Sequence, residues 1–550
     1  MKITEIRIRN FKCFKEELIL PLNNGVNILV GNNEAGKTTI LEAINLVLTG
    51  LYQGKSIRHD LSQYLFNYDA VKEYLYSLNT QNILPPPSIS IEIFFENESS
   101  PSFMGDCNSK NDDKACGVKL EIRLDDKFKE EYASLLISGL KTLPLEYYEV
   151  CWTGFARNYV IPRSIPMGCA LIDSSNIKNR NNTDLLLSRI IKDYFDENDT
   201  VSVTQTFRQL QESFQNNPAI STLNTKISES CDLSSKSIKL GVDMTSRSAW
   251  EEYLTPYLDD IPFLFVGKGE QAVIKTQLSL ANKTAGKADI ILIEEPENHL
   301  SHTRLNGLLR MINEKCGDKQ VLISTHNSFV ANKLGLNNLI LLHNKDYFHL
   351  SNLSNTTASY FKKLPGFDTL RIILCEASIL VEGASDELVL QKAYMTFHKG
   401  RLPIEDGIDV ISINNLSFPR FLEIAQALKL KTVVVTDNDG DLNALEVKYK
   451  PFKDCKTINI CYDKQIDVRN QIDGKPFNFN TMEPIILRDN SLSLLNSILG
   501  KRYTSSDDLL KYMKAHKVDC ALCLFDYTGK DFVFPKYIKN AVCVWKKEEI

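Results

Sequence analysis

The sequence predicts an α/β protein with more than one domain, and three features predict it. Residues 26–49 have the pattern of a strand, a glycine-rich loop and a helix. Residues 290–293 are an apolar run typical of a strand buried on both faces, and two acids follow it. The runs 377–381 and 432–435 have the same character, and acids again follow each. Because open α/β sheets bind ligands at the carboxyl ends of their strands, we expect functional sites at these edges.

Length and composition limit the possible classes of protein. A chain of 550 residues is too long for one core, and about 100–200 residues per domain predicts three or more units. The formal net charge of −5 gives no overall attraction to nucleic acid, so such contacts would need local basic patches or metal-bridged acids. The 13 cysteines are odd in number and scattered, which does not indicate a disulfide framework. Without a signal-peptide core or an apolar run of about 18 residues, we expect a cytoplasmic protein with no membrane contact.

The N-terminal part begins with an alternating strand at residues 3–8 and carries the first motif soon after. Residues 31–39 match G-x-x-x-x-G-K-[ST] between a strand and a helix. The motif comprises Gly31, Asn32, Asn33, Glu34, Ala35, Gly36, Lys37, Thr38 and Thr39. Backbone N–H groups and the helix N-terminus would surround phosphates there, with Lys37 on the β and γ phosphates and the Thr38 hydroxyl on Mg²⁺. A simple glycine-rich turn is the alternative, and both flanking elements argue against it.

Between this motif and the acidic strand, the pattern changes twice. Residues 88–95 and 118–124 alternate as strands, which predicts an antiparallel layer, and the polar stretch 97–114 between them is expected to be a mobile loop. Residues 184–259 then become helical and polar, with amphipathic stretches near 185–194 and 207–214. We interpret them as an inserted helical arm, which either dimerises or covers the sheet.

The acidic strand delivers Glu294 and Glu295 to its carboxyl end. One acid there can hold Mg²⁺, while the other orients or deprotonates a water for attack on a phosphate. The structural alternative is a buried strand that ends in a charged turn. A predicted strand at 263–266, the loop Gly267-Lys268-Gly269-Glu270-Gln271 and a helix to Ala281 precede it, and a strand at 321–325 follows it and ends in His326.

The order of these motifs resembles the ATP-binding-cassette (ABC) ATPases of the DNA-repair type. The resemblance implies that Glu294 takes the metal-linked acidic role, that Glu295 is the catalytic base and that His326 is the switch histidine. It also implies that Gly267, Gly269 and Glu270 bind nucleotide in trans, in a head-to-tail dimer. Two departures are visible: the first acid is Glu rather than the usual Asp, and no Q-loop glutamine can be placed.

The second acidic region follows residue 365. Two predicted parallel strands bring five carboxylates to neighbouring edges: Glu382, Asp386, Asp437, Asp439 and Asp441. So many anions repel one another unless divalent cations lie among them, and oxygen ligands favour Mg²⁺ or Mn²⁺. An EF-hand calcium site is disfavoured, because loop position 12 would be Lys448 rather than Glu. For Glu382 to Asp386 alone, a helix cap is the alternative.

Glu382, Asp437 and Asp439 resemble the acidic motifs of the Toprim domain, a Rossmann-like α/β fold. Together with the preceding ATPase motifs, they resemble the OLD (overcoming lysogenization defect) family. By this resemblance Glu483 and Asp386 complete a two-metal site, and a C-terminal lysine contacts the scissile phosphate. Lys517 is our choice, with Lys514 as the competitor. The predicted domains are an ABC ATPase in residues 1–183 and 260–365, the helical insertion in 184–259, and the Toprim domain in 366–550.

The function predicted from these sites is an ATP-regulated, metal-dependent DNA endonuclease that uses ATP and Mg²⁺ or Mn²⁺. Family resemblance implies bacterial anti-phage defence, a homodimer or larger homo-oligomer, and a partner such as a helicase or a reverse transcriptase with its DNA. The alternative is a DNA-repair ATPase that cuts nothing. Topoisomerase and primase activities are disfavoured, because the tail after Glu483 is too short for a strand-passage domain and zinc-ligand spacing is missing.

Two smaller patterns complete the expectations. Cys520 and Cys523 lie in an apolar run, which we interpret as a buried strand rather than a zinc or redox site. Basic and aromatic residues near the C-terminus could follow a phosphate backbone, or could simply form a solvated surface: Lys530, Lys536, Tyr537, Lys539, Trp545, Lys546 and Lys547.

Overall fold

The computed structural model describes most of the chain. The described residues are 1–32, 34–96, 101–137, 140–172, 195–229, 240–241, 250, 255–281, 288–315, 319–334, 338–343, 345–349, 354, 356–357, 371–372, 375–414 and 417–545. The chain divides into two compact units, of which the first contains Met1–Leu29 and Gly36–Thr325, and the second contains Val30–Ala35 and His326–Ile550.

An antiparallel sheet forms one layer of the N-terminal part, as the alternating strands predict. Its order is β2-β1-β6-β7-β8. The strands are β1 (Ile3–Arg9), β2 (Leu18–Pro21), β6 (Ile89–Phe95), β7 (Cys116–Leu124) and β8 (Tyr148–Gly154). The same part of the chain forms the helices α2 (Tyr68–Ser77) and α3 (Lys129–Ile137), and the short strands β4 (Leu51–Tyr52) and β5 (Lys55–Ser56) pair with each other.

The expectation of a mobile loop at 97–114 is wrong for its described part, which begins at residue 101. Phe103 is buried in a short 3₁₀ helix, and the Ser109 backbone N–H and hydroxyl both donate to Glu92 Oε2, at 3.0 and 2.6 Å. A buried ring and bonds to a buried carboxylate hold this polar segment against the sheet.

A second sheet carries the nucleotide motif, in the order β15-β14-β3-β13-β12-β9. Its strands are β3 (Val26–Gly31), β9 (Gly168–Ile172), β12 (Ala288–Glu294), β13 (Gln320–Thr325), β14 (Leu339–His343) and β15 (Asp346–His349). β12 lies between β9 and β13 and is parallel to both, as its unbroken apolar run predicts. The helix α1 (Lys37–Thr49) packs on the sheet through the buried residues expected from its spacing. The other helices are α8 (Lys268–Ala281), α9 (His302–Lys315) and α10 (Ser328–Leu334), and β10 (Tyr257–Leu258) and β11 (Ile261–Pro262) form a hairpin.

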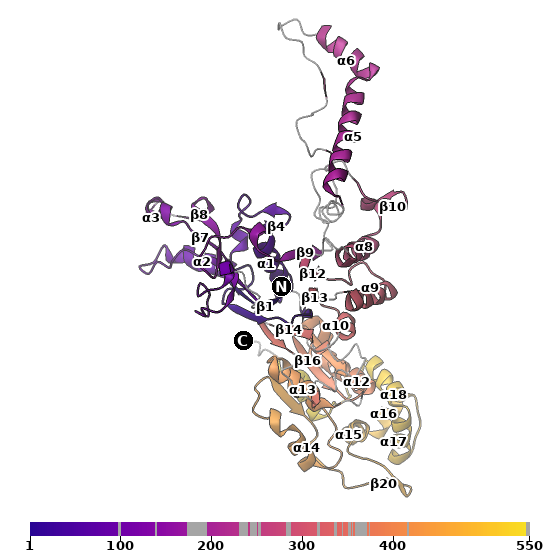
Figure 1. The fold of residues 1–550 in the computed structure, drawn as a ribbon. Helices are drawn as coiled ribbons and strands as arrows, with labels where there is room; N and C mark the ends of the chain where they lie inside the picture. The colour runs from indigo at the N-terminus through magenta and orange to yellow at the C-terminus, as the bar shows by residue number, and fades with distance from the viewer. Residues whose placement is uncertain are drawn as a thin grey trace. The chain divides into compact units, whose positions relative to one another are not determined.

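The predicted helical insertion is present as the long helix α5 (Glu197–Gln215) and the shorter α6 (Pro218–Glu229) (Figure 1). No residue of α5 is buried, and Leu210 and Phe214 on its apolar stripe are 66% and 55% exposed. The predicted amphipathic stretch at 185–194 lies outside the described residues.

Two strand predictions are wrong. Residues 263–265 form a 3₁₀ helix, because the side-chain amide of Gln271 donates to the carbonyls of Phe263 and Val266, at 2.8 Å each, and holds the segment as a turn. The run that contains Cys520 and Cys523 is helical, within α18 (Lys517–Asp526). Cys520, Ala521 and Leu524 are its buried residues, a spacing of one and four that is helical rather than alternating.

From residue 375 onward the chain forms a four-stranded parallel sheet with helices packed against it, in the order β17-β16-β18-β19. Its strands are β16 (Ala377–Val381), β17 (Ile408–Ser412), β18 (Lys431–Val435) and β19 (Ile458–Cys461), with a small hairpin of β20 (Gln471–Ile472) and β21 (Lys475–Pro476). Its helices are α12 (Ala384–Phe397), α13 (Phe418–Ala427), α14 (Leu442–Tyr449), α15 (Met482–Asp489), α16 (Leu492–Leu499), α17 (Ser506–Ala515), α18 and α19 (Lys536–Cys543). Alternate residues of β16 and β18, among them Ile379 and Val433, share one core with α12, α15, α18 and α19. Within the described residues, every helix is too short or too polar to span a membrane.

Candidate functional site

Position 36 of the nucleotide-binding loop requires glycine for two physical reasons. Its φ of 96° lies in the left-handed region, and a Cβ there would lie 2.4 Å from Cζ of Phe14. Gly36 precedes α1, so the helix N-terminus opens directly onto the loop. Asn33 lies outside the described residues, and Ala35 and Thr39 are buried.

The predicted loop residues Lys37 and Thr38 meet the acids that follow β12. The Thr38 hydroxyl donates a hydrogen bond to Glu294 Oε1, and Lys37 Nζ lies 3.9 Å from Glu295 Oε1. Burial lowers the pKa of Lys37, while Glu295, Glu297 and Glu294 oppose that shift. A hydroxyl, an ammonium group and carboxylates at a helix N-terminus have the chemistry to hold Mg²⁺ and a triphosphate.

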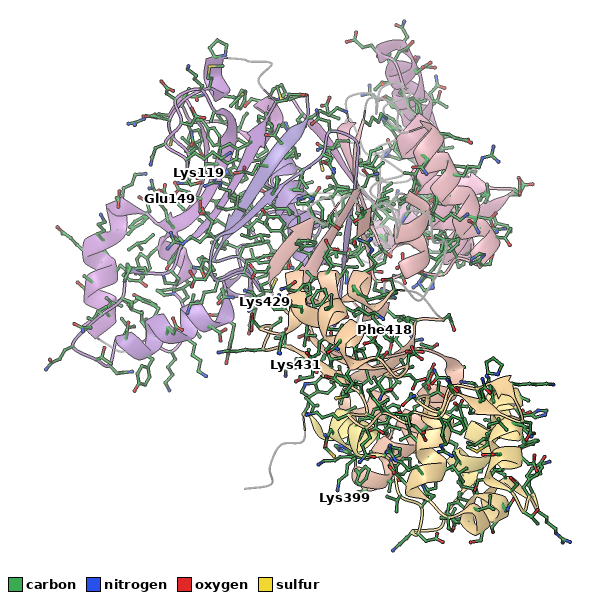
Figure 2. The ribbon with its side chains drawn as sticks, turned by 90° about the horizontal axis from the view of Figure 1, so that it is seen from below. Lys119, Glu149, Lys399, Phe418, Lys429 and Lys431 are labelled. Carbon is green, nitrogen blue, oxygen red and sulfur yellow. The ribbon has the colours of Figure 1, made fainter. Side chains whose placement is uncertain are left out.

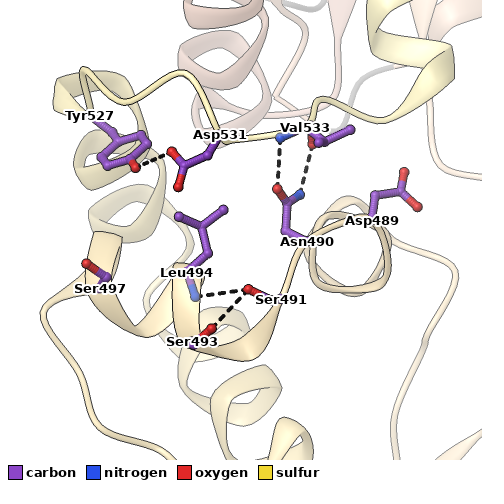
Figure 3. Close-up of a pocket in the computed structure, with 9 residues that line it drawn as sticks. All are labelled: Asp489, Asn490, Ser491, Ser493, Leu494, Ser497, Tyr527, Asp531 and Val533. Atoms are coloured by element: carbon purple, nitrogen blue, oxygen red, sulfur yellow. Dashed lines mark hydrogen bonds between the residues drawn. The ribbon is translucent and has the colours of Figure 1, made fainter.

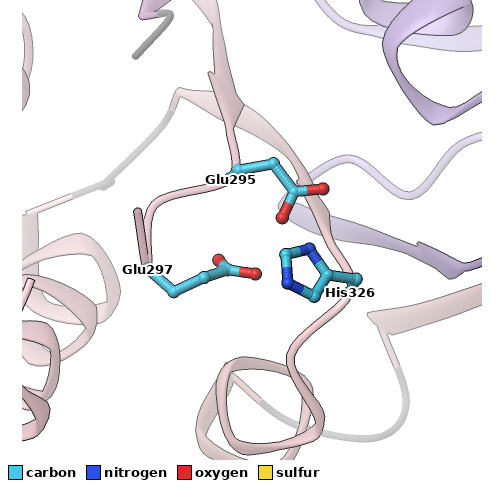
Figure 4. Close-up of side chains that lie close together, drawn as sticks. All are labelled: Glu295, Glu297 and His326. Carbon is cyan, nitrogen blue, oxygen red and sulfur yellow. The ribbon is translucent and has the colours of Figure 1, made fainter. Parts of the chain in front are cut away.

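Glu297 is a residue of this site to which the sequence assigned no role. The Thr325 hydroxyl donates to Glu297 Oε1 at 2.6 Å, and burial, together with a hydrogen bond to Glu295, raises the pKa of Glu297 to about 7. Glu295, Glu297 and His326 each offer one ligand atom, and these atoms lie within 4.8 Å of one another (Figure 4). The sequence feature that could have indicated this role is the third acid of Glu-Glu-Pro-Glu, which follows the assigned pair after one proline.

The predicted trans loop is the first turn of α8 rather than a loop before it. A Cβ on Gly269 would lie 2.2 Å from the carbonyl oxygen of His299, so this glycine permits the turn after β12 to pack against α8. Glu270 pairs with Arg304 of α9 at 3.5 Å. Gly267, in contrast, has no atom within 4 Å of the position of a Cβ.

The second group of acids lies where the neighbouring parallel strands β16 and β18 end. Glu382 follows β16, and its Oε1 accepts a hydrogen bond from the hydroxyl of Thr436, the residue before Asp437, at 2.8 Å. Asp386 is in the first turn of α12, where its Oδ2 accepts from the backbone N–H of Gly383 at 2.8 Å. The structure thus brings the two predicted edges together, and Thr436 is a further contributor that the sequence did not reveal.

Four carboxylates interact through their charges at this site: Glu382, Asp386, Asp437 and Glu483. Burial raises the pKa of Asp437 well above its usual value, and the negative charges of Glu382, Asp386 and Glu483 add to the shift. Burial likewise raises the pKa of Asp386 to about 6, again with Glu483 and Glu382 contributing. Four carboxylates that lie close together, two of them strongly desolvated, are a donor set suited to Mg²⁺ or Mn²⁺.

One lysine faces this cluster. Lys517, the first residue of α18, forms an ion pair with Glu483 at 2.9 Å. Burial acts to lower its pKa, but the carboxylates of Glu483, Asp437 and Asp386 together raise it. Lys514, the competitor, instead places its Nζ 4.8 Å from the centre of the Phe477 ring.

Asp439 and Asp441 lie differently from these acids. Asp439 is exposed, and its Oδ1 accepts a hydrogen bond from the Asn478 side-chain amide at 2.8 Å. Asp441 caps α14 by accepting from the backbone N–H of Ala444 at 2.9 Å. Because α14 begins at Leu442, there is no twelve-residue calcium loop.

Three asparagines shape this edge of the sheet. The buried Asn438 donates to the carbonyls of Asp463 and Gln465 at 2.8 Å each, and Asn480 bonds both the backbone N–H and the carbonyl of Asp467. Asn478 Oδ1 accepts from the Asn480 N–H at 2.9 Å while its amide holds Asp439. These contacts join the strand ends to the segment that leads into Glu483.

Two further features of the second unit are Tyr537 and a cavity beside α16. Tyr537, proposed as a surface contact for DNA, is buried in the core, so that role is excluded for it. A separate cavity of about 480 Å³ is lined by Asp489, Asn490, Ser491, Tyr527 and neighbouring residues, and it contains none of the predicted site residues (Figure 3).

Comparison with known proteins finds two family matches along the chain. A family described as an AAA domain matches residues 5–364, and one described as "Overcoming lysogenization defect protein-like, TOPRIM domain" matches residues 373–439.

Curated relatives match shorter stretches. The chain is 40% identical over 58 residues to "DNA double-strand break repair Rad50 ATPase" of Pyrococcus abyssi, covering 10% of this chain and 6% of that protein. It is 29% identical over 143 residues to "DNA replication and repair protein RecF" of Shewanella sediminis, covering 26% of this chain and 36% of that protein. The chain therefore spans about a third or less of the length of these relatives.

Among solved structures, the SMC head domain from Thermotoga maritima matches with 15% identity and a TM-score of 0.28, covering 63% of this chain and 97% of that one. The AAA-domain match covers more than half of the chain. The chain therefore belongs to the AAA-domain ATPases, joined to a TOPRIM domain of the overcoming-lysogenization-defect type, as its motif order predicted.

Proposed function

We propose that this protein is an ATP-controlled, divalent-metal-dependent DNA endonuclease. The observation that carries the proposal is the group of four coupled carboxylates formed by Glu382, Asp386, Asp437 and Glu483, with Lys517 beside them. A domain that only bound partners would gain nothing from burying so much mutually repelling charge, since desolvating unpaired ions destabilises a fold.

In this proposal Glu382, Asp386, Asp437 and Glu483 hold Mg²⁺ or Mn²⁺, and the exposed Asp439 is a further ligand candidate. Two such ions supply an activated water and stabilise the leaving oxygen of a phosphodiester. Lys517 neutralises charge on the scissile phosphate. We assign Asp441 to its helix cap.

The nucleotide site controls this chemistry. Lys37 binds the phosphates, Thr38 and Glu294 hold the magnesium ion, and Glu295 orients the attacking water, with His326 beside it. The α8 turn with Gly267, Gly269 and Glu270 completes the site of a second copy, which makes the active form a homodimer or a larger homo-oligomer. Resemblance to the OLD family supports a role in anti-phage defence, with a helicase or a reverse transcriptase and its DNA as partner.

A second candidate is a DNA-repair ATPase that binds DNA without cutting it. The similarity to the Rad50 repair ATPase and to the RecF replication and repair protein favours this candidate, although the matched stretches are short.

Purified protein mixed with supercoiled plasmid, with Mg²⁺, Mn²⁺ or EDTA and with or without ATP, separates the two candidates. We expect metal-dependent cutting that Glu382→Ala abolishes, while Asp526→Ala, which removes an exposed acid at the far end of α18, still cuts. Lys37→Ala reports what ATP does to the reaction. ATP hydrolysis without cutting under every condition, in wild-type protein that binds the plasmid, would favour the repair ATPase.

A further inference from the structure

Several lysines lie at the end of the C-terminal sheet where its strands begin, opposite the end that carries the carboxylates. β18 and β19 are parallel and begin side by side, since the backbone N–H of Thr432 donates to the carbonyl of Thr457 at 2.9 Å. Lys431 directly precedes Thr432, and Lys456 directly precedes Thr457. The two lysines therefore flank the same pair of strand starts.

Consecutive turns bring three more lysines to this edge. The N–H groups of Lys453, Cys455 and Ile458 donate to the carbonyls of Lys450, Phe452 and Cys455 respectively, so residues 450–458 form one compact coil that ends at β19. Lys429 ends the turn after α13, where its N–H donates to the carbonyl of Gln426 at 3.2 Å. We call Lys429, Lys431, Lys450, Lys453 and Lys456 the lysine edge.

Apolar neighbours fix this edge in place. Leu430, between the first two lysines, is 2% exposed, and Phe452 and Ile458 are each 6% exposed. All five lysines are exposed, and Lys429 and Lys431 project at neighbouring positions in Figure 2. The backbone of the lysine edge is therefore anchored in the core, while its ammonium groups face solvent.

The local charge is strongly positive in a chain whose net charge is −5. Residues 429–431 and 450–456 contain five lysines and one acid, Asp454. Within the described residues, none of the five lysines forms an ion pair. Glu376, at the start of the neighbouring β16, lies on the β17 side, where its carboxylate borders Gly407.

We propose that the lysine edge binds the phosphate backbone of duplex DNA and anchors the substrate away from the cutting site. Lysine offers point charges without the planar fork that reads bases, and the edge has no exposed aromatic ring, so the binding is independent of sequence. β18 separates the two edges by five residues, or about 16 Å at 3.3 Å per residue. That separation is less than one helical turn of B-DNA, which is about 34 Å. The inference rests on the proposed function, because it assigns the anchor of the same substrate.

Fluorescence anisotropy of a labelled 30-base-pair duplex in EDTA tests the proposal on the full chain. The triple variant K431A/K453A/K456A should raise the Kd at least tenfold near 100 mM salt. It should also reduce the steepness of log K against log salt by about 0.9 per lysine removed, since each neutralised phosphate releases counterions.

The matched control is K333A/K399A/K475A, which removes three exposed lysines of the same unit that belong to neither site. We expect less than a threefold change for it. An unchanged Kd in the first triple, or equal losses in both, overturns the lysine edge as the anchor. The charge-preserving K431R/K453R/K456R variant should keep the affinity, which separates loss of charge from loss of folding.

The test stays separate from the nuclease proposal, because in EDTA no cutting is required. Tight DNA binding that depends on the lysine edge, without cutting when metal is added, would support the lysine edge as the DNA anchor and contradict the nuclease proposal. Cutting that Glu382→Ala abolishes, with a Kd indifferent to the lysine edge, would do the reverse.

Discussion

Buried carboxylates at the ends of strands dominate the chemistry of individual residues. Glu297 and Asp386 have pKa values raised to about 7 and about 6, chiefly because burial disfavours their charged forms. Each retains a hydrogen-bond donor, Thr325 for Glu297 and the Gly383 N–H for Asp386, so neither position is merely apolar. Such groups are costly in the free protein and useful once a ligand supplies positive charge.

Glu297→Gln should therefore change stability with a definite sign. The folded-state pKa of about 7 lies above the usual 4.5, so wild-type stability falls as pH rises between these values. The variant lacks this loss and should be more stable than wild type at pH 8, by up to about 3 kcal/mol, and similar to it near pH 4.5. Thermal unfolding in EDTA without nucleotide measures the difference. A variant less stable than wild type at pH 8 would contradict the assignment.

Asn478 offers a test of how Asp439 is positioned. Asn478→Asp keeps the acceptor for the Asn480 N–H but replaces the donor to Asp439 with a second negative charge. Losing a partner that orients a metal ligand typically lowers metal affinity 10- to 100-fold. Because we propose Asp439 as a ligand, we expect that loss in Mn²⁺ titrations by calorimetry. Asn496→Asp is the control, because the side chain of Asn496 bonds the backbone of Tyr503. Equal Mn²⁺ affinity in both variants would leave Asn478 with a structural role alone.

At the scale of elements, the turn after β12 and the first turn of α8 depend on each other. Gly269 permits their close approach, and Gln271 holds the 3₁₀ helix that precedes α8. The conformation of the predicted trans loop is therefore set by packing within its own unit, before any second copy contributes.

Gly269→Ala should destabilise this arrangement, because its Cβ would lie 2.2 Å from the His299 carbonyl oxygen. Overpacking of this kind costs about 1–3 kcal/mol, visible as a lower Tm together with slower ATP hydrolysis. Gly267→Ala is the matched control and should keep the wild-type Tm within about a degree or two, because no atom lies within 4 Å of its added Cβ. Equal effects of the two substitutions would show that the His299 contact is unimportant.

At the scale of the whole molecule, the proposed ATP-dependent dimer makes oligomeric mass a readout. Glu295→Gln removes the proposed catalytic base while keeping a hydrogen-bonding side chain beside Lys37, so bound ATP should persist. Light scattering after size exclusion should then show a mass increase with ATP and Mg²⁺ that is absent in Lys37→Ala. A mass of Glu295→Gln that ATP leaves unchanged would argue against nucleotide-driven assembly.

The sequence by itself determined the two-part α/β architecture, the order of the motifs and the strand ends that carry acids. These follow from local patterns: unbroken apolar runs for strands buried on both faces, helical spacing in α1, and glycine where φ is positive. Local patterns failed at residues 263–265, where a glutamine side chain eight residues from Phe263 holds the turn, and at Cys520, where helical burial decided the conformation.

Only the tertiary structure decided which side chains share a site. It coupled Glu382, Asp386, Asp437 and Glu483, placed Lys517 rather than Lys514 beside them, and left Asp441 as a helix cap. It also revealed Glu297, Thr436 and Asn478, whose roles come from partners 28, 54 and 39 residues away in the chain. The physical reason is that burial and charge coupling depend on distances in space, and a single sequence records those distances only where neighbours in the chain are also neighbours in the fold.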